Sequence, residues 1–109
     1  MKRLYLAGPY SADNVIDVLA NIRRGIRAAA YLISKGYAVF CPFLDFQIAL
    51  TTYGEELEKE DYQRNSMAWV EVCDVVVVLP GSEKSHGVKR EIERAVTLGI
   101  PVDRYEEFV

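Results

Sequence analysis

The stretch "DVVVVLPGSEKSHGVKREIERAV", residues Asp74 to Val96, decides the fold class of this sequence. Its run of four valines and a leucine predicts a strand that is covered on both faces, as in a parallel sheet. The segment after it is helical from Gly87 to about Leu98, and Gly99 ends the helix. A buried strand, a turn with glycine and serine, and an amphipathic helix in this order are typical of an α/β unit.

The rest of the chain repeats this alternation of strand and helix. Expected strands span residues 3–8, 37–42 and 100–102, and expected helices span residues 15–34 and 59–73. Between them, residues 43–60 predict a short helical piece and a mobile loop around Gly54. We therefore expect a three-layer, flavodoxin-like or Rossmann-like α/β domain, in which helices flank a small parallel sheet.

Composition limits the class of protein. With 109 residues, 50% of them hydrophobic, the chain predicts one domain over residues 1–109. A net charge of −3 argues against nucleic acid and anionic membranes as partners. No apolar run approaches the roughly 20 residues of a membrane helix. Gly8 and Pro9 interrupt the apolar start, and Cys41 and Cys73 fit a reducing compartment, so we expect a cytoplasmic protein.

One charged residue of the last long helix faces the wrong way. On a helical wheel at about 100° per residue, Glu91 lies on the apolar side with Val88 and Ala95, whereas the other charged residues face away. Shielded from water and close to the helix start, this carboxylate suits attack on an electrophilic carbon. A glutamate that reaches the edge of the face, or that pairs with an arginine, would also explain the pattern.

Three loops follow the carboxyl ends of the expected strands, where ligands bind in such sheets: "GPYSADN", "PFLDF" and "PGSEKSHG". In the last loop, Ser82 and Ser85 precede a helix, and a helix start favours an anion. A plain turn with an N-cap is the structural alternative. The chain lacks GxxxxGK[ST] and GxGxxG, which disfavours a P-loop nucleotidase or a dinucleotide-binding dehydrogenase.

Other polar and aromatic residues have two interpretations each. Tyr10 can stack on a ligand, whereas Tyr5 lies inside a strand, where tyrosines are usually core residues. His86 has no partner for a triad or a metal site and is expected near the anion. In the helix of residues 59–73, Asn65 and Ser66 fall within or beside the apolar arc that faces inward. They are either hydrogen-bonded core residues or part of a pocket wall. That arc is formed by Tyr62, Trp69, Val72 and Cys73.

The segments "YLAGPYS", "CDVVVVLPG" and "SHGVKREIERA" together resemble the nucleoside 2′-deoxyribosyltransferase-like superfamily over nearly the whole chain. Within it, the spacing Ser85-x-Gly87-Val88-x-x-Glu91 is most similar to the deoxyribonucleoside 5′-monophosphate N-glycosidases. The resemblance implies that Glu91 is the catalytic nucleophile and that Tyr5 orients it.

The resemblance also implies the residues that bind substrate. Gly8, Pro9 and Tyr10 would shape the floor of the nucleoside site, and Ser85 and Gly87, with Ser82, would hold a 5′-phosphate. No metal or organic cofactor is implied, and the sequence has no cluster of metal ligands. Relatives form homodimers or larger homo-oligomers, and the tail "DRYEEFV" is either part of such a contact or a surface tail.

Two departures from the family pattern concern the substrate. Many members have an aspartate in the third helix that assists the sugar or the leaving base, and this chain has Ser66 there. Either another group such as Asp61 or Asp45 replaces it, or the base leaves with less help, or the activity differs. The N-glycosidases also have an arginine just after the first strand, which Arg23 or Arg24 would replace only if the helix starts late.

We therefore expect an enzyme that acts on a small nucleotide or nucleoside. The leading hypothesis is hydrolysis, or transfer, at the N-glycosidic bond of a nucleoside 5′-monophosphate through a covalent glycosyl–Glu91 intermediate. The alternatives are a nucleoside 2′-deoxyribosyltransferase that acts on free nucleosides and a non-catalytic nucleotide-binding or sensing module. A purely structural or interaction protein is the third hypothesis.

Overall fold

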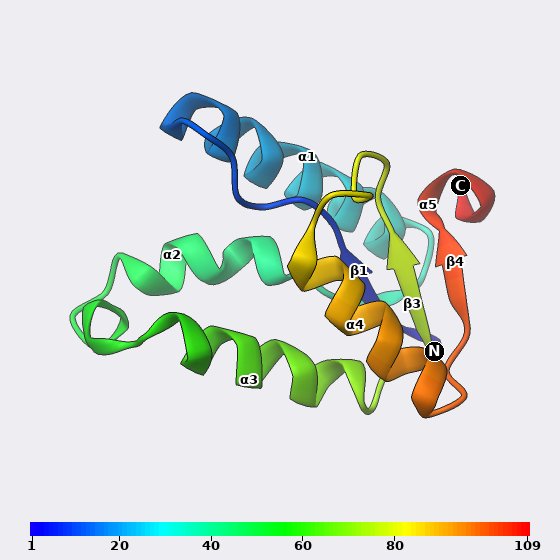
Figure 1. Ribbon diagram of the computed structural model, residues 1–109. Coiled ribbons are helices and arrows are strands. Elements are labelled where there is room, and N and C mark those ends of the chain that lie inside the picture. The colour runs from blue at the N-terminus through cyan, green and yellow to red at the C-terminus, as the bar shows by residue number, and fades with distance from the viewer.

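The computed structural model describes all 109 residues and has one sheet of four parallel strands. Strands β1 (Arg3–Ala7) and β3 (Val75–Val78) lie at its centre, and β2 (Ala38–Phe40) and β4 (Val102–Arg104) form its edges (Figure 1). The order is β2-β1-β3-β4. The predicted class, a small parallel sheet flanked by helices, is confirmed.

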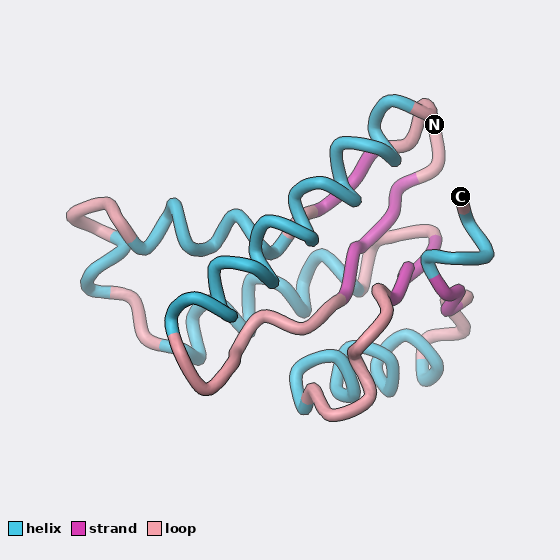
Figure 2. Tube along the Cα trace, turned by 90° about the horizontal axis from the view of Figure 1, so that it is seen from above, coloured by secondary structure: helices cyan, strands magenta, loops and turns pink.

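The helices cover both faces of this sheet. Helix α1 packs on one face, and α3 and α4 pack on the other, so the strands lie between α1 and α4 when viewed from above (Figure 2). None of the helices has both the length and the apolar character needed to cross a membrane. Their bounds are α1 (Val15–Ser34), α2 (Asp45–Ala49), α3 (Lys59–Val70), α4 (His86–Thr97) and α5 (Tyr105–Phe108). Two 3₁₀ turns, η1 (Pro42–Leu44) and η2 (Gly54–Glu56), flank α2.

Strand β1 divides the core in two because its side chains alternate between the faces of the sheet. Leu4 and Leu6 pack with α1, whereas Tyr5 and Ala7 pack on the side of α3 and α4. All four are at most 1% exposed, as expected of a central strand buried on both faces. A polar group on Tyr5 therefore needs a partner from α3 or α4.

Helix α1 begins and ends as the sequence predicts. The Asn14 side chain caps it by accepting a hydrogen bond from the Asp17 N–H at 2.9 Å. At the other end, Gly36 has a φ of 95°, which glycine adopts without strain. The start at Val15 excludes the late start that would have let Arg23 or Arg24 follow β1 directly.

Two sequence predictions about the second half of the chain are wrong in detail. Helix α3 ends at Val70 and turns Ser66 and Val70 inward, so Trp69 and Val72 are half exposed rather than core residues. The last strand is Val102–Arg104 instead of residues 100–102, because Pro101 has no N–H to donate to a ladder.

The C-terminal tail folds back onto the protein. Its residues form α5, and Tyr105 and Phe108 pack against the core cluster on the α1 face of the sheet. The Phe108 ring lies 5.1 Å from that of Tyr37, centroid to centroid. The aromatic side chains of the tail, Tyr105 and Phe108, thus have partners within the same chain.

The carboxyl ends of all four strands point to the same edge of the sheet. The helix after β1 covers one face and the helix after β3 covers the other, so the loops that follow these neighbouring strands diverge. Such a point in a parallel sheet leaves a crevice in which ligands bind.

Candidate active site

A cavity of about 530 Å³ opens at this crevice. Its walls come from four parts of the chain: the loop after β1, the segment after β2, the first turns of α3, and α4 with the loop before it. This volume lies within the range of small-molecule sites. All three loops that the sequence predicted at the ligand-binding edge contribute to it.

Glu91 and Tyr5 meet at this cavity. The Tyr5 hydroxyl donates a hydrogen bond to Oε2 of Glu91, across the contact between β1 and α4. Tyr5 is fully buried, whereas Glu91 is partly exposed to the cavity. The inward glutamate on the helical wheel and the tyrosine inside the strand are therefore partners, and Tyr5 fixes one oxygen of the carboxylate.

Burial controls the protonation of this pair. It raises the pKa of Glu91 to about 7, and the hydrogen bond from Tyr5 and the positive charge of Arg90 oppose the rise. The pKa of Tyr5 rises far above its usual value, through burial first and the negative charge of Glu91 second. Tyr5 thus remains a protonated hydrogen-bond donor at neutral pH.

The start of α4 forms the wall beside Glu91. Ser85 is its N-cap, and the Ser85 Oγ accepts a hydrogen bond from the Val88 N–H at 3.3 Å. Because that oxygen is used as an acceptor, the hydroxyl hydrogen remains free to donate. A Cβ placed on Gly87 would have no atom closer than 3.9 Å, so the backbone there is open to the cavity. This arrangement suits a small anion.

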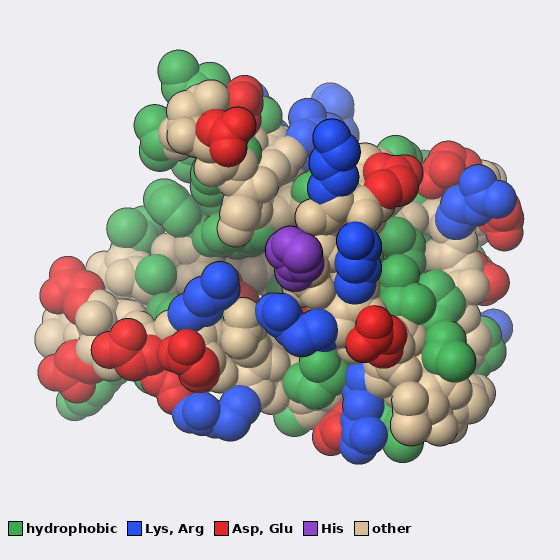
Figure 3. Space-filling model, in the orientation of Figure 1, with side chains coloured by type: hydrophobic (Ala, Val, Ile, Leu, Met, Phe, Trp, Pro, Cys, Tyr) green, Lys and Arg blue, Asp and Glu red, His purple; other side chains and the backbone are tan.

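Positive side chains gather around the mouth of the cavity. Figure 3 shows lysine and arginine side chains on several sides of the single histidine, His86. The cations that line the cavity are Lys59, Lys84 and Arg90. None of the four ion pairs in the structure involves them. Their charge is therefore available to an anionic ligand, although the protein as a whole is acidic.

The loop after β1 forms the opposite wall. Gly8, Pro9 and Tyr10, which the family resemblance implied as the floor of a nucleoside site, all line the cavity. The Tyr10 ring stacks on Phe43 with 6.4 Å between centroids, and its burial raises the pKa of its hydroxyl. The aromatic face of Tyr10 is thus held in place beside the cavity.

Ser66 lies next to the buried end of this site. It lines a smaller cavity of about 110 Å³ that shares Glu91 and Asp45 with the larger one. The Ser66 side chain is buried, and its hydroxyl opposes the rise in the pKa of Tyr5. A serine here has no acidic proton to give, so its place in the structure is that of a polar neighbour of the Tyr5–Glu91 pair.

Ser82 is the one predicted site residue that the structure keeps apart from the others. It is 6% exposed, and its hydroxyl donates to the carbonyl oxygen of Leu79 at 2.7 Å. This bond closes the turn after β3, which is a common local use of serine. Ser82 lines a different cavity, on the far side of that turn, together with Arg104.

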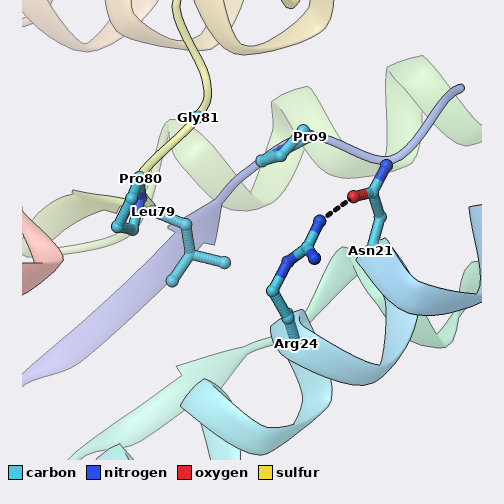
Figure 4. A pocket seen from close by; sticks show the side chains of 6 residues that line it. All are labelled: Pro9, Asn21, Arg24, Leu79, Pro80 and Gly81. Atoms are coloured by element: carbon cyan, nitrogen blue, oxygen red, sulfur yellow. Dashed lines mark hydrogen bonds between the residues drawn. The ribbon is translucent and has the colours of Figure 1, made fainter. Parts of the chain in front are cut away.

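Arg24 belongs to an adjoining cavity of about 500 Å³. Figure 4 shows its guanidinium directed to the side chain oxygen of Asn21, to which it donates a hydrogen bond. Pro9 and Gly81 border both cavities, so the loop after β1 separates Arg24 from Glu91. Arg24 thus does not line the cavity of Glu91, and Arg23 is exposed elsewhere on α1.

Four residues at the site had no place in the sequence prediction of binding groups: Lys59, Gln63, Lys84 and Arg90. Lys59 and Gln63 lie at the start of α3, whose relation to the sheet edge depends on the long segment after β2. A helical wheel turns Arg90 away from the apolar side, which hides its contact with the cavity. The structure contains no group of three or more histidine, cysteine or carboxylate side chains arranged to hold a metal ion.

Comparison with known proteins identifies the family. A family model described as a domain of unknown function, DUF7768, matches residues 2–105. The chain belongs to the DUF7768 family. No curated protein matches this DUF7768 chain.

A solved structure shares the fold of this DUF7768 domain. It is described as a 2-deoxyribosyltransferase from the psychrotolerant bacterium Bacillus psychrosaccharolyticus, and it superposes with a TM-score of 0.63 at 20% sequence identity. The match covers 94% of this chain and 70% of the other. At this identity, the comparison establishes a common α/β architecture.

Proposed function

We propose that this protein cleaves the N-glycosidic bond of a nucleoside 5′-monophosphate, with Glu91 as the nucleophile. The observation that carries the proposal is the hydrogen bond from the buried Tyr5 to Glu91 at a cavity with a cationic mouth. An enzyme with this fold is named for transfer of a deoxyribosyl group, which favours chemistry at the same bond.

The arrangement suits a two-step displacement. One oxygen of Glu91 is held by Tyr5, which leaves the other free to attack the anomeric carbon of the sugar as the base departs. Water, or a second base, then displaces Glu91 and restores the carboxylate. Tyr5 acts as a positioning residue because its hydroxyl touches Glu91 rather than the reacting carbon.

The phosphate is expected at the start of α4. The hydroxyl hydrogen of Ser85 and the backbone near Gly87 supply donors, and Lys59, Lys84 and Arg90 supply positive charge. The anomeric carbon would then lie near Glu91, which is two helical turns or less from Ser85. The base would lie against Tyr10.

Transfer between free nucleosides is the second candidate. The shared fold with a 2-deoxyribosyltransferase, described as a biocatalyst for nucleoside synthesis, favours it. The two activities use the same nucleophile and differ in the acceptor and in the need for a phosphate.

The test is incubation of the purified protein with ribo- and deoxyribonucleosides and their 5′-monophosphates, with and without a second base. We expect free base and sugar phosphate from a monophosphate. The Glu91→Gln variant should lose at least about a thousand-fold in rate, as when a nucleophile is removed. Mass spectrometry of quenched enzyme should find a sugar phosphate on the peptide that contains Glu91.

Other outcomes contradict this proposal in different ways. Exchange of bases between free nucleosides, without hydrolysis of monophosphates, would favour the transferase. A rise in melting temperature with a nucleotide, but no release of base, would indicate a binding module. Equal rates for the wild type and Glu91→Gln would exclude the covalent mechanism.

A further inference from the structure

Asp45 is a second carboxyl group that faces the cavity of Glu91. It is the first residue of α2 and follows the turn η1 at the end of β2. It lines both the 530 Å³ cavity and the smaller cavity of Ser66, as Glu91 does. The negative charge of Asp45 also raises the pKa of Glu91, so the two groups interact electrostatically.

Phe43, in the turn η1 two residues before Asp45, is anchored deep in the core. Phe43 is 1% exposed, and its ring fits against Gly25 of α1 so closely that a Cβ on Gly25 would lie 2.2 Å from it. The same ring stacks with Tyr10. Because Phe43 is fixed on two sides, the segment that carries Asp45 has a defined position at the cavity wall.

The Asp45 carboxyl has no protein partner that would hold it ionised. It takes part in none of the ion pairs, and burial is the one cause of the rise in its pKa, to about 6. Asp61 is the other candidate to replace a third-helix aspartate, but both of its carboxylate oxygens already have protein partners. Its Oδ2 accepts from the Glu58 N–H at 2.8 Å in the cap of α3, and its Oδ1 pairs with Arg64.

We propose that Asp45 donates the proton to the base that departs when Glu91 attacks the sugar, an inference that rests on the proposed function. In the first step, a Glu91 oxygen bonds to the anomeric carbon and the carbon–nitrogen bond breaks. Its electron pair goes to the base nitrogen, and the Asp45 proton neutralises that base. In the second step, the Asp45 carboxylate takes a proton from water, the water oxygen bonds to the anomeric carbon, and the Glu91–carbon bond breaks.

The proposed reaction requires ionised Glu91 and protonated Asp45, and the surroundings of the two carboxyl groups differ. The Tyr5 hydrogen bond and Arg90 stabilise ionised Glu91, whereas Asp45 has neither. With a pKa of about 7 for Glu91 and about 6 for Asp45, the single proton that the pair shares between these pH values lies mostly on Glu91 in the free protein, and the reaction uses the form in which it lies on Asp45. Other titratable or charged groups around the pair are Tyr10 of the loop after β1, Lys59 and Tyr62 of α3, Lys84 of the loop before α4, and His86 of α4.

The experiment compares two leaving groups in the wild type and in Asp45→Asn. One substrate carries an ordinary base, which needs a proton to leave, and the other is the 4-nitrophenyl glycoside of the same sugar phosphate, which does not. Asp45→Asn should slow release of the base by about 10²- to 10⁴-fold, the usual contribution of a general acid. It should release 4-nitrophenolate within a few-fold of the wild-type rate, and its pH profile should lose the alkaline limb.

Asp61→Asn is the matched control and should behave as the wild type with both substrates. Equal losses on both leaving groups would overturn the inference, because a general acid acts on the poor leaving group alone. Unchanged rates on both would overturn it as well, with the proposed function intact. Failure of the wild type on either substrate, with Glu91→Gln no slower, would instead reject the proposed function and the inference with it.

Discussion

The Tyr5 hydroxyl donates a hydrogen bond to the Glu91 carboxylate across the packed interface of β1 and α4, 86 residues apart in the chain. Tyr5 is the buried polar side chain of β1 on the α3 and α4 side of the sheet, and Glu91 accepts its hydrogen bond there. This contact joins the sheet to the wall of the cavity and sets the direction of one carboxylate oxygen.

Replacing Tyr5 by phenylalanine should change the pH dependence of activity. The Tyr5 hydrogen bond lowers the pKa of Glu91, so its loss should move the acidic limb of the kcat/KM profile to higher pH. The rate itself should fall by about 10- to 100-fold. Tyr31→Phe, on the outer side of α1, is the control. A lower rate with an unmoved acidic limb would show that Tyr5 merely fills space.

Glu91→Gln should stabilise the ligand-free protein at alkaline pH. A carboxyl group whose pKa rises from 4.5 to about 7 on folding contributes stability below pH 4.5 that is lost as the pH rises through 7. The neutral amide avoids this loss. Urea unfolding at pH 8 should give a gain of about 1–3 kcal/mol, at 1.36 kcal/mol per pKa unit. The free energies of unfolding of the wild type and Glu91→Gln should become equal near pH 4.5. A difference that is the same at all pH values would show that the raised pKa of Glu91 is not the cause.

Ser85 and Ser82 form a natural pair of test and control. Ser85→Ala should remove the N-cap of α4, at about 0.5–2 kcal/mol, and should raise KM for the monophosphate but not for the free nucleoside. Ser82→Ala should remove the bond to Leu79 and leave KM unchanged, because Ser82 lies outside the cavity. Equal effects of both changes on KM would place the phosphate elsewhere.

Gly25 and Gly87 should respond to alanine in opposite ways. Gly25→Ala forces a Cβ into the Phe43 ring, so we expect a loss of about 1–3 kcal/mol in the free energy of unfolding. Gly87→Ala meets open space inside α4 and should add up to about 1 kcal/mol through helix propensity. The added methyl group faces the expected phosphate, so kcat/KM should nevertheless fall. Thermal unfolding and kinetics of both variants check this.

The fold was predictable where local signals are strong. Four successive valines fix the central strand, and Asn14 and Gly36 mark both ends of α1. Shorter or polar elements had no such signal. Strand β4 includes Asp103 and Arg104 at a sheet edge, and α5 has four residues, too few for a helical period. The inward face of α3 was predicted wrongly because it carries the polar Ser66, whereas the apolar Trp69 and Val72 are half exposed.

The site was predictable to the extent that single residues stand out. Glu91 does so as a charge on an apolar helix face. The pattern alone favoured Tyr5 as a core residue, and the resemblance alone linked it to Glu91. The position of Asp45 in the cavity wall depends on how residues 41–58 cross the edge of the sheet. The packing of Phe43 on Gly25 fixes the start of that segment. Ser82 lies outside the cavity of Glu91, and its hydroxyl bonds within its own turn, which the sequence did not reveal.

Two carboxyl groups in one cavity also define the shape of an inhibitor. In the proposed reaction, positive charge develops on the sugar ring as the base departs, and a sugar bound in this cavity would have both Asp45 and Glu91 beside it. A five-membered cyclic amine with a phosphate on its side arm would carry the same charge permanently. Its affinity should increase as the pH rises through 7, since both carboxyl groups are then ionised, and decrease again where the amine loses its own proton.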